Sequence, residues 1–259
     1  MISDTAAERY ASLLLNAEAK RMPIDPFSAS DPAFLPEDAY RIQDRIASEH
    51  IRRGEMPIGY KVGMTTKPIQ KLFGSDEPDY GVLFDANEIH GGVVETAELI
   101  QPKVEGEIAF VLREDLFGTT YTGEDILRVT EYAFPAIEIV DCRIKDWTFR
   151  IQDTIADSAA CGRFLLTERR PYSGADLRNV RLRAYKNDVF LAEGAGCDVL
   201  GNPADSVAWL ANKLGSRGLA LRKGMVILSG SLVGMHPASS GDQFRFDYDC
   251  FGSVSVRFA

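Results

Sequence analysis

The chain has 259 residues, 45% of them hydrophobic and 26% charged, a composition typical of a globular protein with a large core. Its formal net charge of −9 argues against nucleic acid or an anionic membrane as a partner. No apolar run approaches the ~20 residues that span a bilayer, and Met1–Asp4 lacks the features of a secretory signal, so we expect a cytoplasmic protein.

The four cysteines and three histidines are too dispersed to form a recognisable site. No CxxC pair occurs, and no two histidines show metal-ligand spacing, although His236 remains available for activating a water. A zinc centre and a Cys/His nucleophile are therefore disfavoured, and the cysteines are interpreted as reduced core residues.

Two helices are predicted at the N-terminus. Thr5–Glu8 has the pattern of a capping box, and apolar residues then recur at helical spacing to Ala17. After a Pro/Asp/Ser-rich loop over 21–34, a second helix begins near Pro36 and ends at Gly54. We expect these helices to form a cap over residues 1–55, with a β-rich region over 56–259 in the same compact unit.

Two charged residues follow in unusual surroundings. Lys61 lies in the apolar run Ile58–Thr65, where burying an unpaired ammonium would be costly. It is either a lysine that reaches water at a sheet rim or a cation next to a carboxylate or enolate. Asp79, between Pro78 and Gly81, is either a turn carboxylate bonded to its own backbone or a functional acid.

A strand is predicted over Lys103–Leu112, and it carries two carboxylates on one face. Glu105 and Glu107 are two residues apart, so they point the same way, roughly 7 Å apart along the strand. The same face continues with Ala109 and Val111, which are apolar. Such a pair is tolerated if it faces water, if protons neutralise it, or if a cation lies between the two groups.

A third carboxylate follows a predicted helix that begins at Thr122, continues to about Tyr132 and is stopped by Pro135. Glu138 is central in the β-favouring run 136–140, where uncompensated burial would raise its pKa. Three glutamates on two neighbouring strands offer an all-oxygen site to a hard cation such as Mg²⁺.

The remaining sequence is β-rich. Asn202-Pro203 starts a helix that ends at Gly215 or Gly218, and 225–234 is a buried strand leading into a Ser/Gly turn. Gly241-Asp242 is interpreted as a hairpin turn before the last strand, 252–258. The predicted fold class is α+β, with a helical N-terminal cap on a mixed, curved β-sheet.

The order and spacing of several motifs resemble those of 2-hydroxypenta-2,4-dienoate (2-keto-4-pentenoate) hydratases. The related 2-oxohept-4-ene-1,7-dioate hydratases and 4-oxalocrotonate decarboxylases share most of them, and all resemble the C-terminal β-roll of fumarylacetoacetate hydrolases. The matching motifs run almost from the N-terminus to the end of the chain: 61–65, 77–81, 105–109, 135–138, 153–157, 200–203, 207–211 and 252–254.

The resemblance implies functional residues. Glu105, Glu107 and Glu138 would hold Mg²⁺ or Mn²⁺, and Lys61 and Asp79 would be acid/base residues. Predicted substrate-binding residues lie in two short segments: Asp157, Ser158, Ser229, Gly230 and Ser231. At 156–160, where the family usually has Ala-Asp-Asn-Ala-Ser, this chain has Ala-Asp-Ser-Ala-Ala, so contacts to the substrate carboxylate are expected to differ.

The implied activity is that of a hydro-lyase which adds water to a 2-hydroxy-2,4-dienoate in the meta-cleavage degradation of aromatic compounds. Alternatives are a 4-oxalocrotonate-type decarboxylase, a diacid hydratase and, from another class, a non-catalytic partner in a hydratase–decarboxylase complex. A homo-oligomer is expected, with a pathway decarboxylase or aldolase as a possible partner. The motifs do not specify the C5 substituent of the substrate, which we expect residues 143–162 and 229–235 to select.

Overall fold

The computed structural model describes residues 1–31 and 34–259. Its helices are α1 (Asp4–Lys20), α2 (Phe27–Ser30), α3 (Pro36–Arg52), α4 (Lys67–Leu72), α5 (Gly123–Val129), α6 (Ile151–Ala156) and α7 (Pro203–Ser216). Its strands are β1 (Pro57–Gly63), β2 (Asp79–Phe84), β3 (Val93–Val94), β4 (Pro102–Leu112), β5 (Thr130–Asp141), β6 (Cys161–Leu166), β7 (Arg181–Lys186), β8 (Val189–Ala195), β9 (Val226–Ser231), β10 (His236–Pro237), β11 (Gln243–Tyr248) and β12 (Gly252–Phe258). Over these residues, no helix combines the length and apolar character that crossing a membrane requires.

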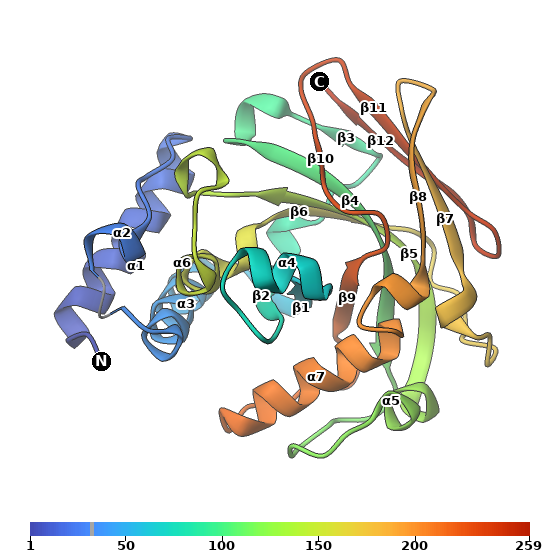
Figure 1. Ribbon diagram of the computed structural model, residues 1–259, viewed down its shortest axis with the longest axis horizontal. Coiled ribbons are helices and arrows are strands. Elements are labelled where there is room, and N and C mark those ends of the chain that lie inside the picture. Colours follow the sequence, from blue (N-terminus) through green and yellow to red (C-terminus); the bar gives the residue numbers. More distant parts are fainter. Residues whose placement is uncertain (32–33) are drawn as a thin grey trace.

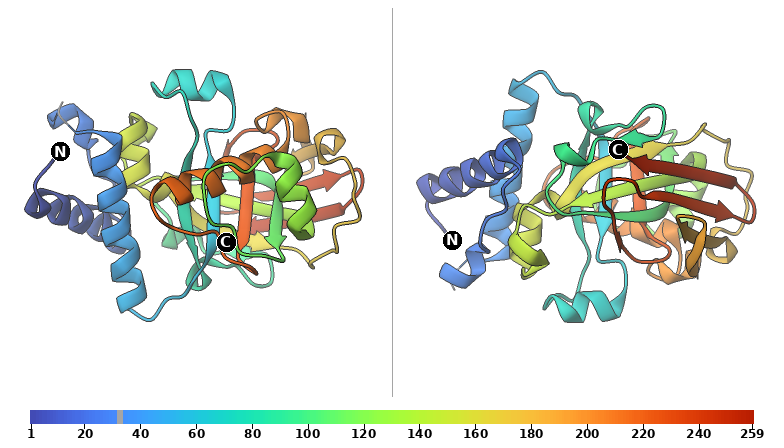
Figure 2. Two further views of the ribbon diagram at one scale, coloured as in Figure 1. Left: turned by 90° about the horizontal axis from the view of Figure 1, so that it is seen from below. Right: turned by 90° about the horizontal axis from the view of Figure 1, so that it is seen from above.

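The N-terminal helices lie together at one side of the β-rich body (Figures 1 and 2). The predicted capping box at Thr5 is wrong in register, because the N-cap is Ser3, whose side chain accepts a hydrogen bond from Ala6 N–H. The predicted loop over 21–34, of which residues 32–33 lie outside the described part of the chain, contains the single turn α2. Helix α3 begins at Pro36 as predicted and is followed by Gly54 at φ 93°. One hydrophobic core joins α1 and α3 to the strands, and the division into cap and β-rich region stays a prediction.

The larger sheet has the strand order β2-β1-β9-β4-β5-β6, with β10 added to β4. It is mixed, since β1 runs parallel to β9 and antiparallel to β2. The sheet is strongly curled, so its end strands approach each other (Figure 1). The α+β class with a mixed, curved sheet is confirmed.

The two faces of β4 enter different cores. Ile108 and Phe110 pack into the large core, whereas Ala109 and Val111 belong to a smaller apolar cluster on the inner face of the curl. The second sheet, β3-β12-β11-β7-β8, packs on the outer side. A Cβ atom on Gly106 would lie 2.7 Å from side chains of that sheet, so the glycine permits close packing and directs its neighbours, both glutamates, inward.

Two sequence predictions in the second half are corrected. The helix that begins after Thr122 ends at Val129, and β5 then runs through Pro135. Proline is accommodated because it lies at the end of the β5–β6 ladder, where Thr167 N–H donates to Pro135 O and only the reciprocal bond is missing. Gly241-Asp242 is not a hairpin turn, since β11 pairs with β12 and β7 rather than with the preceding β10.

Candidate active site

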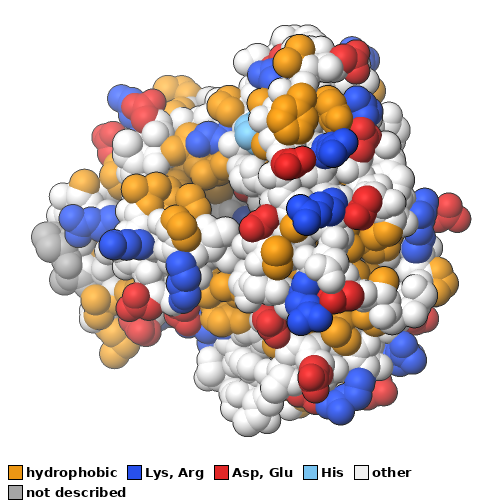
Figure 3. Space-filling view, turned by 45° about the vertical axis from the view of Figure 1, so that its right-hand side comes forward, with side chains coloured by type: hydrophobic (Ala, Val, Ile, Leu, Met, Phe, Trp, Pro, Cys, Tyr) orange, Lys and Arg blue, Asp and Glu red, His pale blue; other side chains and the backbone are white. Residues whose placement is uncertain are grey.

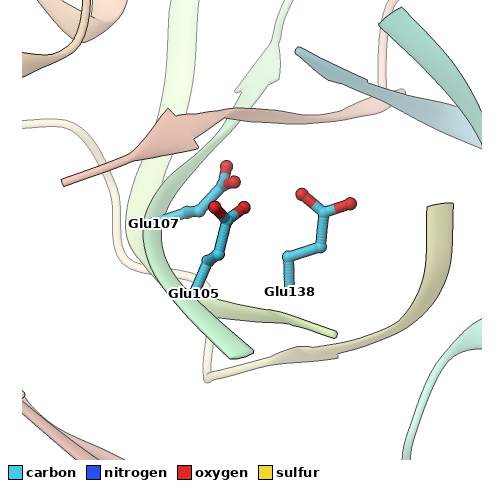
Figure 4. Close-up of side chains that lie close together, drawn as sticks. All are labelled: Glu105, Glu107 and Glu138. Atoms are coloured by element: carbon cyan, nitrogen blue, oxygen red, sulfur yellow. The ribbon is translucent and has the colours of Figure 1, made fainter. Parts of the chain in front are cut away.

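Three glutamate side chains converge inside the curled sheet. In the antiparallel pairing of β4 with β5, Glu105 lies directly opposite Glu138, and Glu107 follows two residues later on the same face. One carboxylate oxygen from each residue lies within 4.8 Å of the others. Figure 4 shows the three carboxylates turned toward one shared space. The structure thus brings together all three acids that the sequence singled out.

Three of the six carboxylate oxygens in this cluster accept no hydrogen bond from the described residues. Gly230 N–H donates to Glu107 Oε2 at 2.7 Å. Within the described residues, Glu107 Oε1 and both oxygens of Glu138 accept no hydrogen bond of good geometry, although both side chains are fully buried. Unsatisfied buried carboxylates are costly. Their oxygen-only chemistry and mutual distances fit a hard divalent cation.

Burial makes the charged form of these acids unfavourable. It raises the pKa of Glu105 to about 7, with a further contribution from the neighbouring charge of Glu138. The pKa of Glu107 is raised well above its usual range for the same reasons, burial first and then Glu138. Burial also raises the pKa of Glu138, against the opposing effect of Lys61. The cluster therefore needs protons or a cation for stability.

Lys61 extends from β1 into the same space. Its Nζ donates to the carbonyl oxygen of Ala159 at 2.9 Å and lies 3.3 Å from Glu138 Oε1. Burial on its own would lower the lysine pKa, but the surrounding carboxylates, Glu138 foremost, raise it. Lys61 is therefore a buried cation held among acids. Of the two alternatives predicted from the sequence, the lysine that reaches water at a sheet rim is excluded.

Asp79 begins β2 and faces Lys61 across Gly63, which is its partner in the β1–β2 ladder. A Cβ atom on Gly63 would lie 2.4 Å from Asp79 Oδ1 and 3.2 Å from Lys61 Nζ, so the glycine provides the space for this pair. Thr154 Oγ1 donates to Asp79 Oδ2 at 3.0 Å, while Oδ1 has no partner among the described residues. Burial raises the Asp79 pKa, and Lys61 and then Thr154 oppose this effect.

A left-handed turn presents the carbonyl group that holds Lys61. Ser158, Ala159 and Ala160 have φ values of 51°, 52° and 54°, a region that non-glycine residues rarely occupy in succession. The turn packs tightly on β2, because a Cβ atom on Gly81 would lie 2.1 Å from Ser158 O. The small residues over 154–162 therefore serve close backbone packing beside the lysine.

A cavity of about 190 Å³ opens onto these groups. Its charged lining residues are Lys61, Asp79 and Glu105, and its other walls come from β1, α4, the segment between β5 and α6, and the end of β9. Figure 3 shows a hollow between the N-terminal lobe and the β-rich body, with hydrophobic side chains along its rim. Another cavity, of about 200 Å³ and lined by His50, Arg143 and Arg163, contains none of the three glutamates.

The predicted substrate-binding residues have different surroundings. Ser231 lines the 190 Å³ cavity, but Ser229 is fully buried and donates to Ile108 O, and the Gly230 N–H is bonded to Glu107. The Asp157 carboxylate is fully buried and accepts from the Arg143 side chain and backbone N–H. Ser158 lines a separate small cavity beside it. Contact of these four residues with substrate stays a prediction.

Several site residues were not singled out from the sequence. Thr154, Gly63 and the carbonyl of Ala159 position Lys61 and Asp79, and the aromatic residues Phe73 and Phe149 line the cavity. Gly63 carried a usable signal, since a glycine two residues from a buried lysine suggests close packing. Thr154 and Ala159 carried none, because their roles depend on the approach of segments distant in sequence.

Curated relatives match almost the whole chain, whereas no family model matches it. A 2-hydroxyhexa-2,4-dienoate hydratase from Comamonas testosteroni is 40% identical over 259 residues, 98% of this chain and 97% of the relative. A 2-hydroxypent-2,4-dienoate hydratase from Pseudomonas putida is 41% identical over 210 residues, 80% of this chain and 95% of the relative.

Solved structures agree with the fold. A 4-oxalocrotonate decarboxylase from Pseudomonas putida G7, complexed with magnesium and adipate, superposes with a TM-score of 0.97 at 32% identity, covering 100% of this chain and 99% of that one. A fumarylpyruvate hydrolase from Pseudomonas aeruginosa, complexed with Mn²⁺ and pyruvate, has a TM-score of 0.61 at 16% identity, covering 77% of this chain and 88% of that one. The second likeness shows a shared fold.

Proposed function

The chain belongs to the family of 2-hydroxypenta-2,4-dienoate (2-keto-4-pentenoate) hydratases and 4-oxalocrotonate decarboxylases, and we propose that it is a divalent-metal-dependent hydratase of 2-hydroxy-2,4-dienoates. The observation that carries the proposal is that three glutamates converge beside Lys61, and that Glu105, Lys61 and Asp79 line one cavity. The proposed role is in the degradation of aromatic compounds after ring cleavage.

The donor set fits a divalent cation such as Mg²⁺ or Mn²⁺. Glu105, Glu107 and Glu138 would hold it, and the observation behind this assignment is that three oxygens of Glu107 and Glu138 accept no hydrogen bond from the described residues. When bound, the ion would supply Lewis-acid stabilisation of negative charge on a substrate oxygen. The magnesium in the related decarboxylase structure agrees with this choice.

Lys61 is proposed to stabilise the enolate formed during the reaction. Its pKa is raised by the nearby acids, so the side chain stays cationic at neutral pH. The contacts with Ala159 O and Glu138 fix the position of the ammonium before substrate binds. A preorganised charge in a water-poor cavity is more effective than the same charge in water.

Asp79 is proposed to act as the acid/base group that accepts protons from the substrate and water and donates protons to substrate carbons. Its Oδ2 is oriented by Thr154, whereas Oδ1 is free to take or give a proton. Burial raises the pKa of this carboxyl group toward the range in which an acid/base catalyst works near neutral pH.

The proposed reaction has two balanced stages. The 2-hydroxy group loses its proton and C5 gains one, which converts the dienol into a 2-oxo-3-enoate with an electrophilic C4. Water then adds its oxygen to C4, its proton passes to the carboxylate base, and C3 gains a proton to give a 4-hydroxy-2-oxoacid. Asp79 would serve as donor and acceptor in turn, so the enzyme ends in its starting protonation state.

The predicted substrate-binding residues differ in whether they line the 190 Å³ cavity. Ser231 lines it and is proposed to bind substrate. Asp157 and Ser158 are proposed to act indirectly, by holding the left-handed turn that presents Ala159 O to Lys61.

Decarboxylation is the nearest alternative, because it needs a similar metal site and enolate. Identity favours the hydratase, at 40% and 41% against 32% for the decarboxylase. A non-catalytic partner role is disfavoured, since a purely structural subunit would have no need for buried acids without hydrogen-bond donors.

One assay tests the proposal. The purified chain with Mg²⁺ is given 2-hydroxypenta-2,4-dienoate or 2-oxohex-3-enedioate, and loss of the dienol absorbance is followed beside CO₂ release. We expect dienol loss with formation of the 4-hydroxy-2-oxoacid, no CO₂, and full inhibition by a chelator. CO₂ release from the diacid as the faster reaction would instead assign the chain as a decarboxylase.

A homo-oligomer in the cytoplasm, working beside a pathway decarboxylase or aldolase, is the proposed setting. Gel filtration of the chain alone, and after mixing with such an enzyme, measures both associations. Elution as a monomer under both conditions would contradict them.

A further inference from the structure

A buried amide, that of Gln43, joins the N-terminal helices to two segments of the active site. Gln43 lies in α3 and is only 1% exposed. Its Nε2 donates to Tyr80 O at 2.7 Å and to Ile155 O at 3.0 Å. Both acceptors are backbone carbonyl oxygens, which cannot donate, so the nitrogen end of the amide must face them. One amino group therefore bridges β2 and α6, which are distant in sequence.

The two residues that Gln43 contacts are the direct neighbours of Asp79 and Thr154. Tyr80 follows Asp79 in β2, and Ile155 follows Thr154 in α6. Thr154 Oγ1 in turn donates to Asp79 Oδ2 at 3.0 Å. Two cross-links, one through the Gln43 amide and one through the Thr154 hydroxyl, therefore join the same two segments one residue apart.

The N-terminal helices also hold α6 on the other side of Thr154. In α2, Ser28 N–H donates to Asp153 Oδ1 at 2.9 Å, and the Asp153 side chain is fully buried. Thr154 thus lies between a residue held by Ser28 and a residue held by Gln43. Helix α6 has only six residues, and so short a helix has little stability of its own. Its position therefore depends on these tertiary contacts.

The orientation of Asp79 depends on where α6 lies. Asp79 Oδ1 has no hydrogen-bond partner among the described residues, so Thr154 supplies the side-chain hydrogen bond that orients the carboxylate. A displacement of α6 from β2 by about 0.5 Å or more would stretch that bond beyond useful length. We propose that Gln43 is a positioning residue, which sets the separation of β2 and α6 at which Thr154 can orient Asp79. The inference rests on the proposed function.

Gln43→Met tests this role, because it removes both donors at nearly constant length and volume. We expect kcat for hydration to fall about tenfold and KM to change less than about threefold, since Asp79 is misplaced rather than removed. Ile42→Val, which removes one carbon from a fully buried neighbour in α3, is the matched control for lost packing and should retain the wild-type kcat. A kcat within threefold of wild type in folded Gln43→Met, or an equal loss in Ile42→Val, overturns the proposal.

A double-mutant cycle distinguishes positioning through Thr154 from general destabilisation. Thr154→Val alone should lower kcat by a factor similar to that of Gln43→Met. In the Thr154→Val background, Gln43→Met should then lower kcat by less than about threefold further, because the bond that it disturbs is already absent. A further tenfold loss would show independent effects and overturn the proposal. If Gln43→Met does not fold, Gln43→Asn takes its place in the cycle, since it keeps a buried amide that is one methylene too short to reach both carbonyls.

A measurement without turnover separates this inference from the proposed function. Amide hydrogen exchange should be faster over residues 79–82 and 153–157 in Gln43→Met than in the wild type, and unchanged there in Ile42→Val. Absence of hydration by the wild-type chain would reject the proposed function alone, and the exchange rates then decide whether Gln43 holds the two segments. Wild-type exchange rates in Gln43→Met would overturn the inference even if hydration is observed.

Discussion

Lys61 Nζ lies 3.3 Å from Glu138 Oε1, although β9 and β4 separate their strands in the sheet. Only the curl of the sheet brings β1 and β5 this close. The contact places one buried cation beside two buried acids, Glu107 and Glu138, and the half-buried Glu105. The same curl encloses the apolar cluster beneath them. The closure of the sheet therefore creates both the charge cluster and the water-poor surroundings that strengthen it.

Glu107→Gln is expected to abolish Mg²⁺ binding and activity, because it removes a charged ligand and leaves an amide donor facing Glu138. Calorimetric titration with Mg²⁺ and the hydration assay measure the two effects. Glu114→Gln, an exposed change in the bend that follows β4, is the control and should behave as the wild type. Metal-independent hydration by Glu107→Gln would exclude the glutamate cluster as the metal site.

Asp79→Asn is expected to lower kcat by roughly 10²–10⁴-fold, the range attributable to a general acid/base group. KM should change little, since the amide fills the same space beside Thr154. Steady-state kinetics with Asp76→Asn, an exposed neighbour, as the control test this assignment. A loss of less than threefold would remove Asp79 from the proton-transfer steps.

Thr154→Val is expected to shift the acidic limb of the kcat/KM–pH profile to higher pH. The Thr154 hydroxyl donates to Asp79 Oδ2 and stabilises the ionised carboxylate, which lowers its pKa. Removing the donor therefore raises the pKa, and if the ionised form is required, more alkaline conditions are needed to reach it. Thr154→Ser keeps the hydroxyl and should retain the wild-type profile. A shift to lower pH would contradict the proposed role.

Gly63→Ala is expected to reduce kcat on the order of 10²-fold, because the new Cβ would lie 2.4 Å from Asp79 Oδ1 and must displace the carboxylate. Thermal unfolding and Mg²⁺ titration should show that the variant folds and still binds metal, since the atoms nearest the new Cβ belong to Asp79 and Lys61 and not to a glutamate. Unaltered kcat in a folded variant would show that the Lys61–Asp79 geometry tolerates this displacement.

Without divalent cations, stability is expected to fall as pH rises from about 4.5 to about 7. The pKa of Glu105 is about 7 in the folded chain against an ordinary value of 4.5, so the folded state binds more protons over this interval. Unfolding temperatures with a chelator measure the slope, which Glu105→Gln should reduce and added Mg²⁺ should reverse. A wild-type slope identical to that of Glu105→Gln would contradict this account.

The sequence by itself determined the strand that carries Glu105 and Glu107, the presence of Glu138 in the next strand, and the unusual placement of Lys61. These features follow from local rules, because the period of a strand assigns residues two apart to one face. Local rules also located α3 and its end near Gly54. They wrongly extended the helix after Thr122 to Tyr132, which instead pairs with β4 as part of a strand.

Only the tertiary structure decided how these residues meet. The choice for Lys61 between water and carboxylates depended on the curl of the sheet, and the orientation of Asp79 depended on Thr154, 75 residues further along the chain. The 190 Å³ cavity is likewise lined by residues of α4 and of the segment after β5, which are distant in sequence. Such relations depend on packing between distant segments, which no local pattern encodes, so only the tertiary structure shows which side chains share the cavity.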